Sequence, residues 1–91
     1  MEFEFDPAKD EANRFKHGLR LGFGMRIFAD PCHQILPSFR PVDGEDRYKA
    51  VGVIEGKHFT LVYVERMDKL RLISVRLSNA SEQRDYDRDS R

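Results

Sequence analysis

The residues best suited to chemistry lie in the second half of the chain, on consecutive stretches that have the pattern of strands. Six of them stand out as candidates: Glu45, Arg47, Tyr63, Arg66, Arg71 and Arg76. Cleavage of an RNA phosphodiester needs a group that takes the 2′-hydroxyl proton, a group that protonates the leaving oxygen, and cations that stabilise the phosphorane. Arginine meets the last need through bidentate contacts, and no metal is required when the 2′-hydroxyl is the nucleophile. Adjacent antiparallel strands would bring several of the six onto one concave face.

Each of these residues also has a structural interpretation. Glu45 and Arg47 are two positions apart, so on a strand they point to the same side, and together they would make a rim salt bridge. Tyr63 would be a core tyrosine with a paired hydroxyl. Strict alternation over residues 69–77 predicts that Leu70, Leu72, Ser74 and Arg76 share one face. That face turns from apolar to polar along the strand, which is typical of a cleft rim or of arginines that extend from a half-covered sheet.

The motifs that the chain lacks limit the chemistry it could perform. The chain has no glycine-rich phosphate-binding loop, no HExxH pattern and no set of several Cys and His residues at the spacing of a zinc site. A single cysteine, Cys32, excludes an internal disulfide. We therefore expect neither a metal nor a cofactor. Of the three histidines, His17 is the most notable, because it falls at a predicted helix C-terminus, where the helix dipole favours a positive charge.

Local patterns predict the elements that would position these residues. A strand is expected at 1–5, a helix at 8–16 begun by Asp6-Pro7 and ended by Gly18, and a short helix at 21–28. A loop with a brief strand at 35–36 follows. Strands at 47–54, 58–65 and 69–77 are joined by short turns, and a helix at 80–86 is capped from Ser78-Asn79. This order predicts an α+β fold, an antiparallel meander packed against two N-terminal helices and one C-terminal helix.

Bulk properties predict one cytosolic domain. The 91 residues suit a single domain spanning 1–91, with a flexible tail at about 87–91. No stretch is apolar enough to span a membrane, and the acidic N-terminus lacks the features of a secretory signal. Sixteen basic and sixteen acidic residues give zero net charge, which counts against independent DNA binding. Residues 57–78, however, carry five basic residues against two acidic ones, so a neutral total is compatible with a basic face.

Taken together, the motifs resemble the BrnT toxin family over residues 3 to about 86. The opening FEFDPAKDEANRFKHGL has the family's aromatic-Asp pair before a helix with a Lys-His-Gly end, and FADP matches its Phe-x-Asp-Pro step. EDR with the later Gly52 is similar to Glu-x-Arg and the glycine that follows it. LVYVER and RLISVR are similar to two family strands, and Glu82 and Tyr86 match the final helix.

The resemblance implies a RelE-like fold and metal-independent endoribonuclease activity that inhibits translation. It implies a BrnA-like antitoxin with a ribbon-helix-helix part as partner, and contact with operator DNA only through an autorepressing toxin–antitoxin complex. The predicted catalytic residues are Glu45, Arg47, Arg71 and Arg76, with Glu45 as a base and Arg71 and Arg76 on the phosphate. The predicted substrate-binding residues are Lys16, His17, Tyr63 and Arg66. The alternative is a catalytically inactive interaction module or co-repressor subunit on the same fold.

Overall fold

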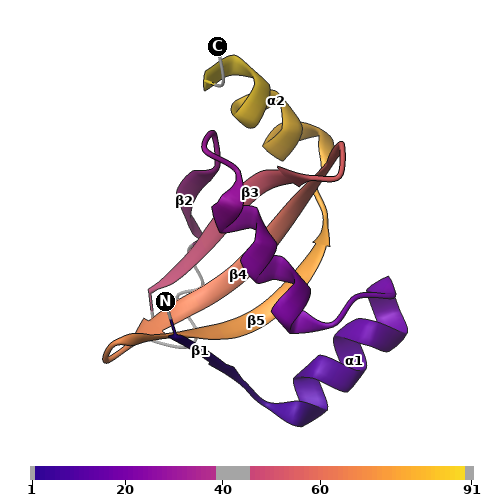
Figure 1. Cartoon of the computed structure of the whole chain (residues 1–91), viewed down its shortest axis with the longest axis vertical. Helices are drawn as coiled ribbons and strands as arrows, with labels where there is room; N and C mark the ends of the chain where they lie inside the picture. Colours follow the sequence, from indigo (N-terminus) through magenta and orange to yellow (C-terminus); the bar gives the residue numbers. More distant parts are fainter. Residues whose placement is uncertain (1, 39–45, 90–91) are drawn as a thin grey trace.

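The computed structural model describes residues 2–38 and 46–89 of the chain. Within them the elements follow the predicted order (Figure 1): β1 (Glu2–Phe5), α1 (Pro7–His17), η1 (Leu21–Ala29), β2 (Gln34–Ser38), β3 (Arg47–Ile54), β4 (Lys57–Arg66), β5 (Lys69–Leu77) and α2 (Ala80–Asp89). The predicted positions of the helices and strands are confirmed to within a few residues. η1 is a 3-10 helix, and its two glycines lower the α-helix propensity of this segment.

The predicted antiparallel meander is wrong as a description of the whole sheet. The five described strands have the order β1-β5-β4-β3-β2, and β1 runs parallel to β5. β2, β3, β4 and β5 pair antiparallel in that order, and short turns join β3 to β4 and β4 to β5. A four-residue strand is not stable alone, so β1 joins the free edge of β5. Residues 6–68 lie between the two strands, which easily provides the crossover that parallel pairing needs.

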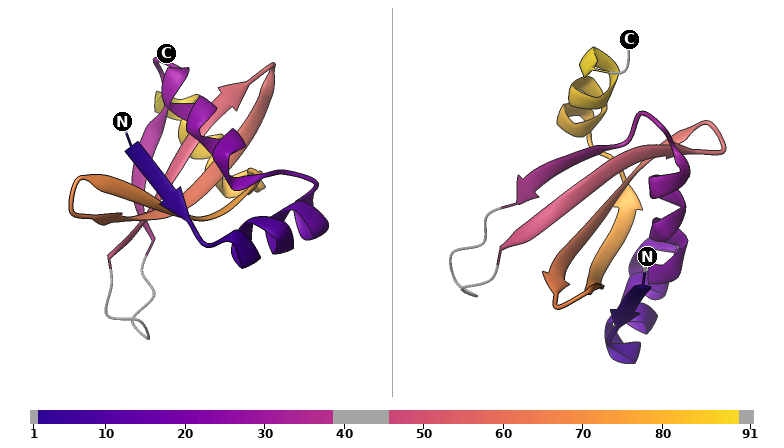
Figure 2. Two further views of the ribbon diagram at one scale, coloured as in Figure 1. Left: turned by 60° about the horizontal axis from the view of Figure 1, so that its bottom comes forward. Right: turned by 60° about the vertical axis from the view of Figure 1, so that its left-hand side comes forward.

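The two faces of the sheet are covered by different helices (Figure 2). η1 crosses one face and buries Leu21 and Ile27 against the core residues of β3, β4 and β5. A Cβ on Gly24 would stand 2.6 Å from Leu61 Cδ1, so glycine is what allows this close approach. α2 packs on the opposite face, where its Glu82 contacts Thr60 of β4. α2 does not cover the whole of this second face, and the uncovered part forms a pocket.

α1 is fixed beside β5 by a buried asparagine. Asp6 caps the helix by accepting a hydrogen bond from the Ala8 N–H, as predicted. Asn13, 5% exposed, donates from Nδ2 to the carbonyls of Leu19 and Val75, and its Oδ1 accepts from the Val75 N–H. Since β1 pairs with β5 only as far as Leu72, the Asn13 amide takes the place of a partner strand at the next part of that edge.

α2 begins with a reciprocal cap, in line with the prediction at Ser78-Asn79. The Glu82 N–H donates to Asn79 Oδ1, and the Asn79 N–H donates to Glu82 Oε1. Farther along, the Tyr86 hydroxyl donates to Asp30 Oδ2 at 2.6 Å, and this hydrogen bond raises the pKa of Tyr86 to about 12. The helix continues to Asp89, past the predicted end near Tyr86. No helix in the described segments is long and apolar enough to cross a membrane.

Candidate functional site

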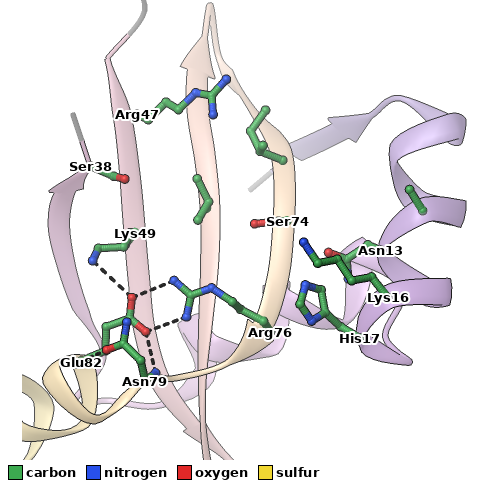
Figure 3. Close-up of a pocket in the computed structure, with 13 residues that line it drawn as sticks. Asn13, Lys16, His17, Ser38, Arg47, Lys49, Ser74, Arg76, Asn79 and Glu82 are labelled. Atoms are coloured by element: carbon green, nitrogen blue, oxygen red, sulfur yellow. Dashed lines mark hydrogen bonds and ion pairs between the residues drawn. The ribbon is translucent and has the colours of Figure 1, made fainter. Parts of the chain in front are cut away.

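A polar pocket of about 540 Å³ opens on the second face of the sheet, between α1 and the start of α2 (Figure 3). Five of the residues that line it carry a basic side chain, and they come from three separate elements: Lys16, His17, Arg47, Lys49 and Arg76. The remaining lining residues are Ala12, Asn13, Ser38, Val62, Ile73, Ser74, Asn79 and Glu82. Glu82 is the only carboxylate among these described lining residues, so the pocket is predominantly basic.

Sheet register explains how β3 and β4 contribute to this pocket. Arg47 lies opposite Val64, and Lys49 lies opposite Val62. Directly opposed residues share a face, and alternate residues of one strand do too. Arg47 and Lys49, two positions apart on β3, therefore point to the same side of the sheet. In Figure 3, Arg47 and Lys49 project from β3 on the side of the sheet that carries Arg76.

An irregularity in β5 changes which residues face the pocket. Ser74 lies opposite Val62 but Leu72 lies opposite Tyr63, so the register shifts between Val62 and Tyr63. One additional β5 residue, Ile73, breaks the alternation, as in a β-bulge. Leu72 is fully buried in the core, whereas Ser74 lines the pocket. The prediction that Leu72 and Ser74 share one face is therefore wrong, because strict alternation has no place for the bulge.

Arg76 is held by an ion pair at the base of the pocket. Its Nη1 and Nη2 donate to Glu82 Oε1 and Oε2 at 2.7 and 2.9 Å, a bidentate arrangement. Lys49 reaches the same carboxylate from β3, with Nζ 3.2 Å from Oε2. The Thr60 hydroxyl of β4 donates to Oε1 at 2.9 Å. Side-chain exposure is 30% for Arg76 and 26% for Lys49, so both remain accessible from the pocket.

α1 supplies the other wall. Its last turn carries Lys16 and His17, which project from the helix toward β5 and Arg76 (Figure 3). The helix ends because Gly18 adopts a left-handed conformation, with φ of 73°, and donates its N–H to the Arg14 carbonyl. The Asn13 contacts with β5 then hold this last turn against the sheet. Local capping and one buried amide thus place the Lys16 ammonium group and the His17 imidazole at the pocket.

The structure brings four of the predicted site residues to this pocket, namely Lys16, His17, Arg47 and Arg76. Arg71 is not among the lining residues. Arg71 lies opposite Val64, on the face of the sheet that carries the pocket. Its Nη1 donates to Glu4 of β1 at 2.7 Å. Glu45 lies outside the described residues.

The remaining two predicted residues lie elsewhere. Tyr63 is 3% exposed on the opposite face, where it stacks on Tyr48 and meets the edge of Phe28. Burial there raises the pKa of the Tyr63 hydroxyl. Arg66 is exposed at the end of β4, beside the β4–β5 turn. Neither residue lines the basic pocket.

Lys49 and Glu82 line the pocket but were not predicted as site residues. Lys49 carried a usable signal, since it is two positions after Arg47 on a predicted strand and alternation gives it the same face. Glu82 was identified only as a match to the final helix of the family pattern. Its contacts with β3, β4 and β5 depend on where α2 docks, which no local pattern specifies.

Glu82 is a buried charge stabilised by its neighbours. Burial opposes its ionisation, but hydrogen bonds from Arg76, the Asn79 N–H and Thr60 outweigh this effect and lower the pKa of Glu82 to about 2. The same pair raises the pKa of Arg76. Within the described residues, no group of three His, Cys, Asp or Glu side chains is placed to hold a metal ion.

The depressed pKa of Glu82 predicts an acid-sensitive fold. Because the folded-state pKa is near 2 and the ordinary value is 4.5, Glu82 stabilises the fold above pH 4.5. This contribution, on the order of 2–3 kcal/mol, is lost as the pH falls from 4.5 toward 2. Urea unfolding at pH 7 and at pH 2.5 checks this for the parent and Glu82→Gln. The parent should lose more stability than the variant by about that amount; an equal loss in both proteins would contradict the assignment.

Comparison with known proteins agrees with the resemblance seen in the sequence. A comparison with functionally curated proteins found no match. Residues 5–82 match a family described as "Ribonuclease toxin, BrnT, of type II toxin-antitoxin system". This range contains every residue that lines the basic pocket, from Ala12 to Glu82. The chain belongs to the BrnT family of ribonuclease toxins of type II toxin–antitoxin systems.

Proposed function

We propose that this chain is a metal-independent endoribonuclease that cleaves RNA at the basic pocket and thereby inhibits translation. The observation that carries the proposal is the convergence of five basic side chains, from α1, β3 and β5, on one pocket of about 540 Å³. The four Lys and Arg cations among them suit the phosphodiester backbone, which carries one negative charge per nucleotide. Membership of a ribonuclease family supports RNA as the substrate.

The reaction needs no metal when the substrate supplies the nucleophile. The 2′-oxygen bonds to phosphorus as its proton passes to a base, and the bond from phosphorus to the 5′-oxygen breaks as that oxygen takes a proton. The products are a 2′,3′-cyclic phosphate and a 5′-hydroxyl. Arg76 and Arg47 are proposed to stabilise the charge of the phosphorane, because arginine donors pair with phosphate oxygens. Lys49 adds a third cation to the phosphate site.

Two residues are proposed for proton transfer. His17 lies at the pocket wall, and imidazole is the side chain best suited to accept and donate a proton near neutral pH. Glu45, two positions before Arg47 in the sequence, is proposed as the base on chemical grounds. Lys16 is proposed to bind a neighbouring phosphate.

Outside the pocket, two arginines are proposed to extend the contact with RNA. Arg71 on β5 lies on the pocket face, in line with Val64 of β4 and Arg47 of β3. Arg66 is exposed near the β4–β5 turn. These positions would follow the backbone of a substrate that leaves the pocket along β4 and β5. Tyr63 is not proposed as a substrate contact, because it is buried in the core on the opposite face.

The family implies an antitoxin partner. We propose that this partner is BrnA-like, with a ribbon-helix-helix part, and that the complex represses its own promoter. Contact with DNA would come through the antitoxin, since the chain itself has zero net charge. Action on cellular RNA implies a cytoplasmic location.

The test is RNA cleavage by the purified chain in EDTA. A 5′-labelled single-stranded RNA should be cut to fragments that end in a cyclic phosphate, while DNA of the same sequence should remain intact because it lacks the 2′-hydroxyl. Cleavage that appears only when Mg²⁺ is added would refute the metal-independent mechanism. No cleavage from well-folded protein would favour the alternative, an inactive interaction module on the same fold.

A further inference from the structure

Two cations from different strands meet at one carboxylate in the pocket. Lys49 lies on β3 and Arg76 on β5, with β4 between them. The two strands are two strand spacings apart, about 9.6 Å, and Lys49 is in line with Ser74, two positions before Arg76. Nevertheless Nζ of Lys49 and both terminal nitrogens of Arg76 lie within 3.2 Å of Glu82 oxygens. The carboxylate therefore sets the separation and direction of the two cationic groups.

The carboxylate is itself fixed by two hydrogen bonds besides those from the cations. Glu82 is 2% exposed, and its Oε1 accepts from Thr60 and from the Asn79 N–H, both at 2.9 Å. The second of these hydrogen bonds belongs to the reciprocal cap of α2, so the position of Glu82 follows from where the helix begins. Glu82 is thus a rigid anchor, whereas Lys49 and Arg76 are long side chains that would otherwise sample many rotamers.

Pairing with Glu82 does not use up the positive charge or the hydrogen-bond donors. Two cations and one carboxylate leave a net charge of +1 at this position. Within the described part of the chain, Arg76 uses three of its five N–H donors, two on Glu82 and one on the Leu77 carbonyl at 3.3 Å. The Nε–H and one Nη2–H remain for a phosphate oxygen.

We propose that Glu82 is a positioning residue that holds Arg76 and Lys49 as a preorganised phosphate clamp. It does not touch the substrate; it acts through the two cations. The inference rests on the ribonuclease function proposed above. It predicts that loss of the Glu82 charge affects turnover more than affinity, because the cations remain present but are no longer held in the geometry of the transition state.

The test compares Glu82→Gln with the parent in cleavage and in binding. We expect kcat to fall roughly 10- to 100-fold. Affinity for a 2′-O-methyl RNA, which cannot be cleaved, should stay the same or increase, since the variant has one negative charge fewer. Glu55→Gln makes the same charge change on the β3–β4 hairpin, away from the pocket lining, and should match the parent in both measurements.

A second variant is needed because Glu82 also caps α2. Thr60→Val keeps the charge of Glu82 but removes a hydrogen bond that fixes it, so it should lower kcat less than Glu82→Gln and leave binding intact. Unchanged kcat in Glu82→Gln, or in Thr60→Val where the first variant does not fold, would overturn the proposal. The proposal would also be overturned if the rate per RNA-binding molecule were unchanged and only the number of such molecules fell, since that indicates a loss of folded protein.

Failure of the proposed function would look different. If the parent itself does not cleave RNA, the proposed function is wrong and this inference is wrong with it. If the parent cleaves and Glu82→Gln cleaves equally well, only the positioning role is wrong.

Discussion

Replacing Arg76 with alanine is expected to lower kcat/KM for RNA cleavage roughly 10²- to 10³-fold. Arg76 is the cation at the base of the pocket, and it is fixed there by two hydrogen bonds to Glu82. Removing it takes away donors that would pair with the phosphate as its charge develops in the transition state. Arg76→Lys should retain part of the activity, because it keeps the charge and loses the bidentate geometry.

The same substitution should also destabilise the fold, which the sequence alone did not indicate. A surface arginine would change stability by less than about 0.5 kcal/mol. Arg76, however, neutralises a carboxylate that is 2% exposed, and leaving that group with Lys49 as its remaining cation should cost about 2 kcal/mol.

Kinetics and urea unfolding on the same preparations separate the two effects. Arg14→Ala, an exposed arginine of α1 paired with Glu11, is the matched control and should change neither quantity appreciably. A folded Arg76→Ala variant with parent-like kcat/KM would show that Arg76 supports the structure only, and the proposed site would then be wrong.

The elements of this fold could be predicted because their signals are local. Asp6-Pro7 and Gly18 mark the two ends of α1 through capping and backbone conformation, and alternation with short turns marks β3, β4 and β5. The position of β1 was equally clear from its alternation. Its parallel pairing with β5 was not, because the partner lies more than 60 residues away and only tertiary packing selects it.

Four of the residues that line the pocket were among the predicted site residues, because local patterns place them and distant pairing does not. Alternation correctly implies that Arg47 faces the same side as its i+2 neighbour, so Lys49 could have been added from the sequence. The faces of β5 could not be predicted by strict alternation, since the bulge at Ile73 reverses them midway. Arg71 and Arg76 were predicted to bind the same phosphate, but Arg71 pairs with Glu4 of β1 and does not line the pocket. The bulge and the β1–β5 pairing therefore decide which β5 side chains reach the pocket.

Growth of a bacterial host is expected to stop when this chain is induced alone. An endoribonuclease that cleaves cellular RNA inhibits translation, and the antitoxin that would cover it is absent in this experiment. The Arg47→Ala/Arg76→Ala variant should allow growth, because it removes two of the basic side chains that line the pocket. Co-expression of the cognate antitoxin with the parent should also restore growth.

This growth measurement tests the central claim most directly, provided that soluble levels and circular dichroism of both proteins are compared. Arrest by the parent, with growth restored by an equally soluble and folded double variant, is the result expected of a toxin that acts through the basic pocket. Arrest by both proteins would contradict the assignment of the pocket as the site. Continued growth with abundant, folded parent protein would contradict toxicity itself.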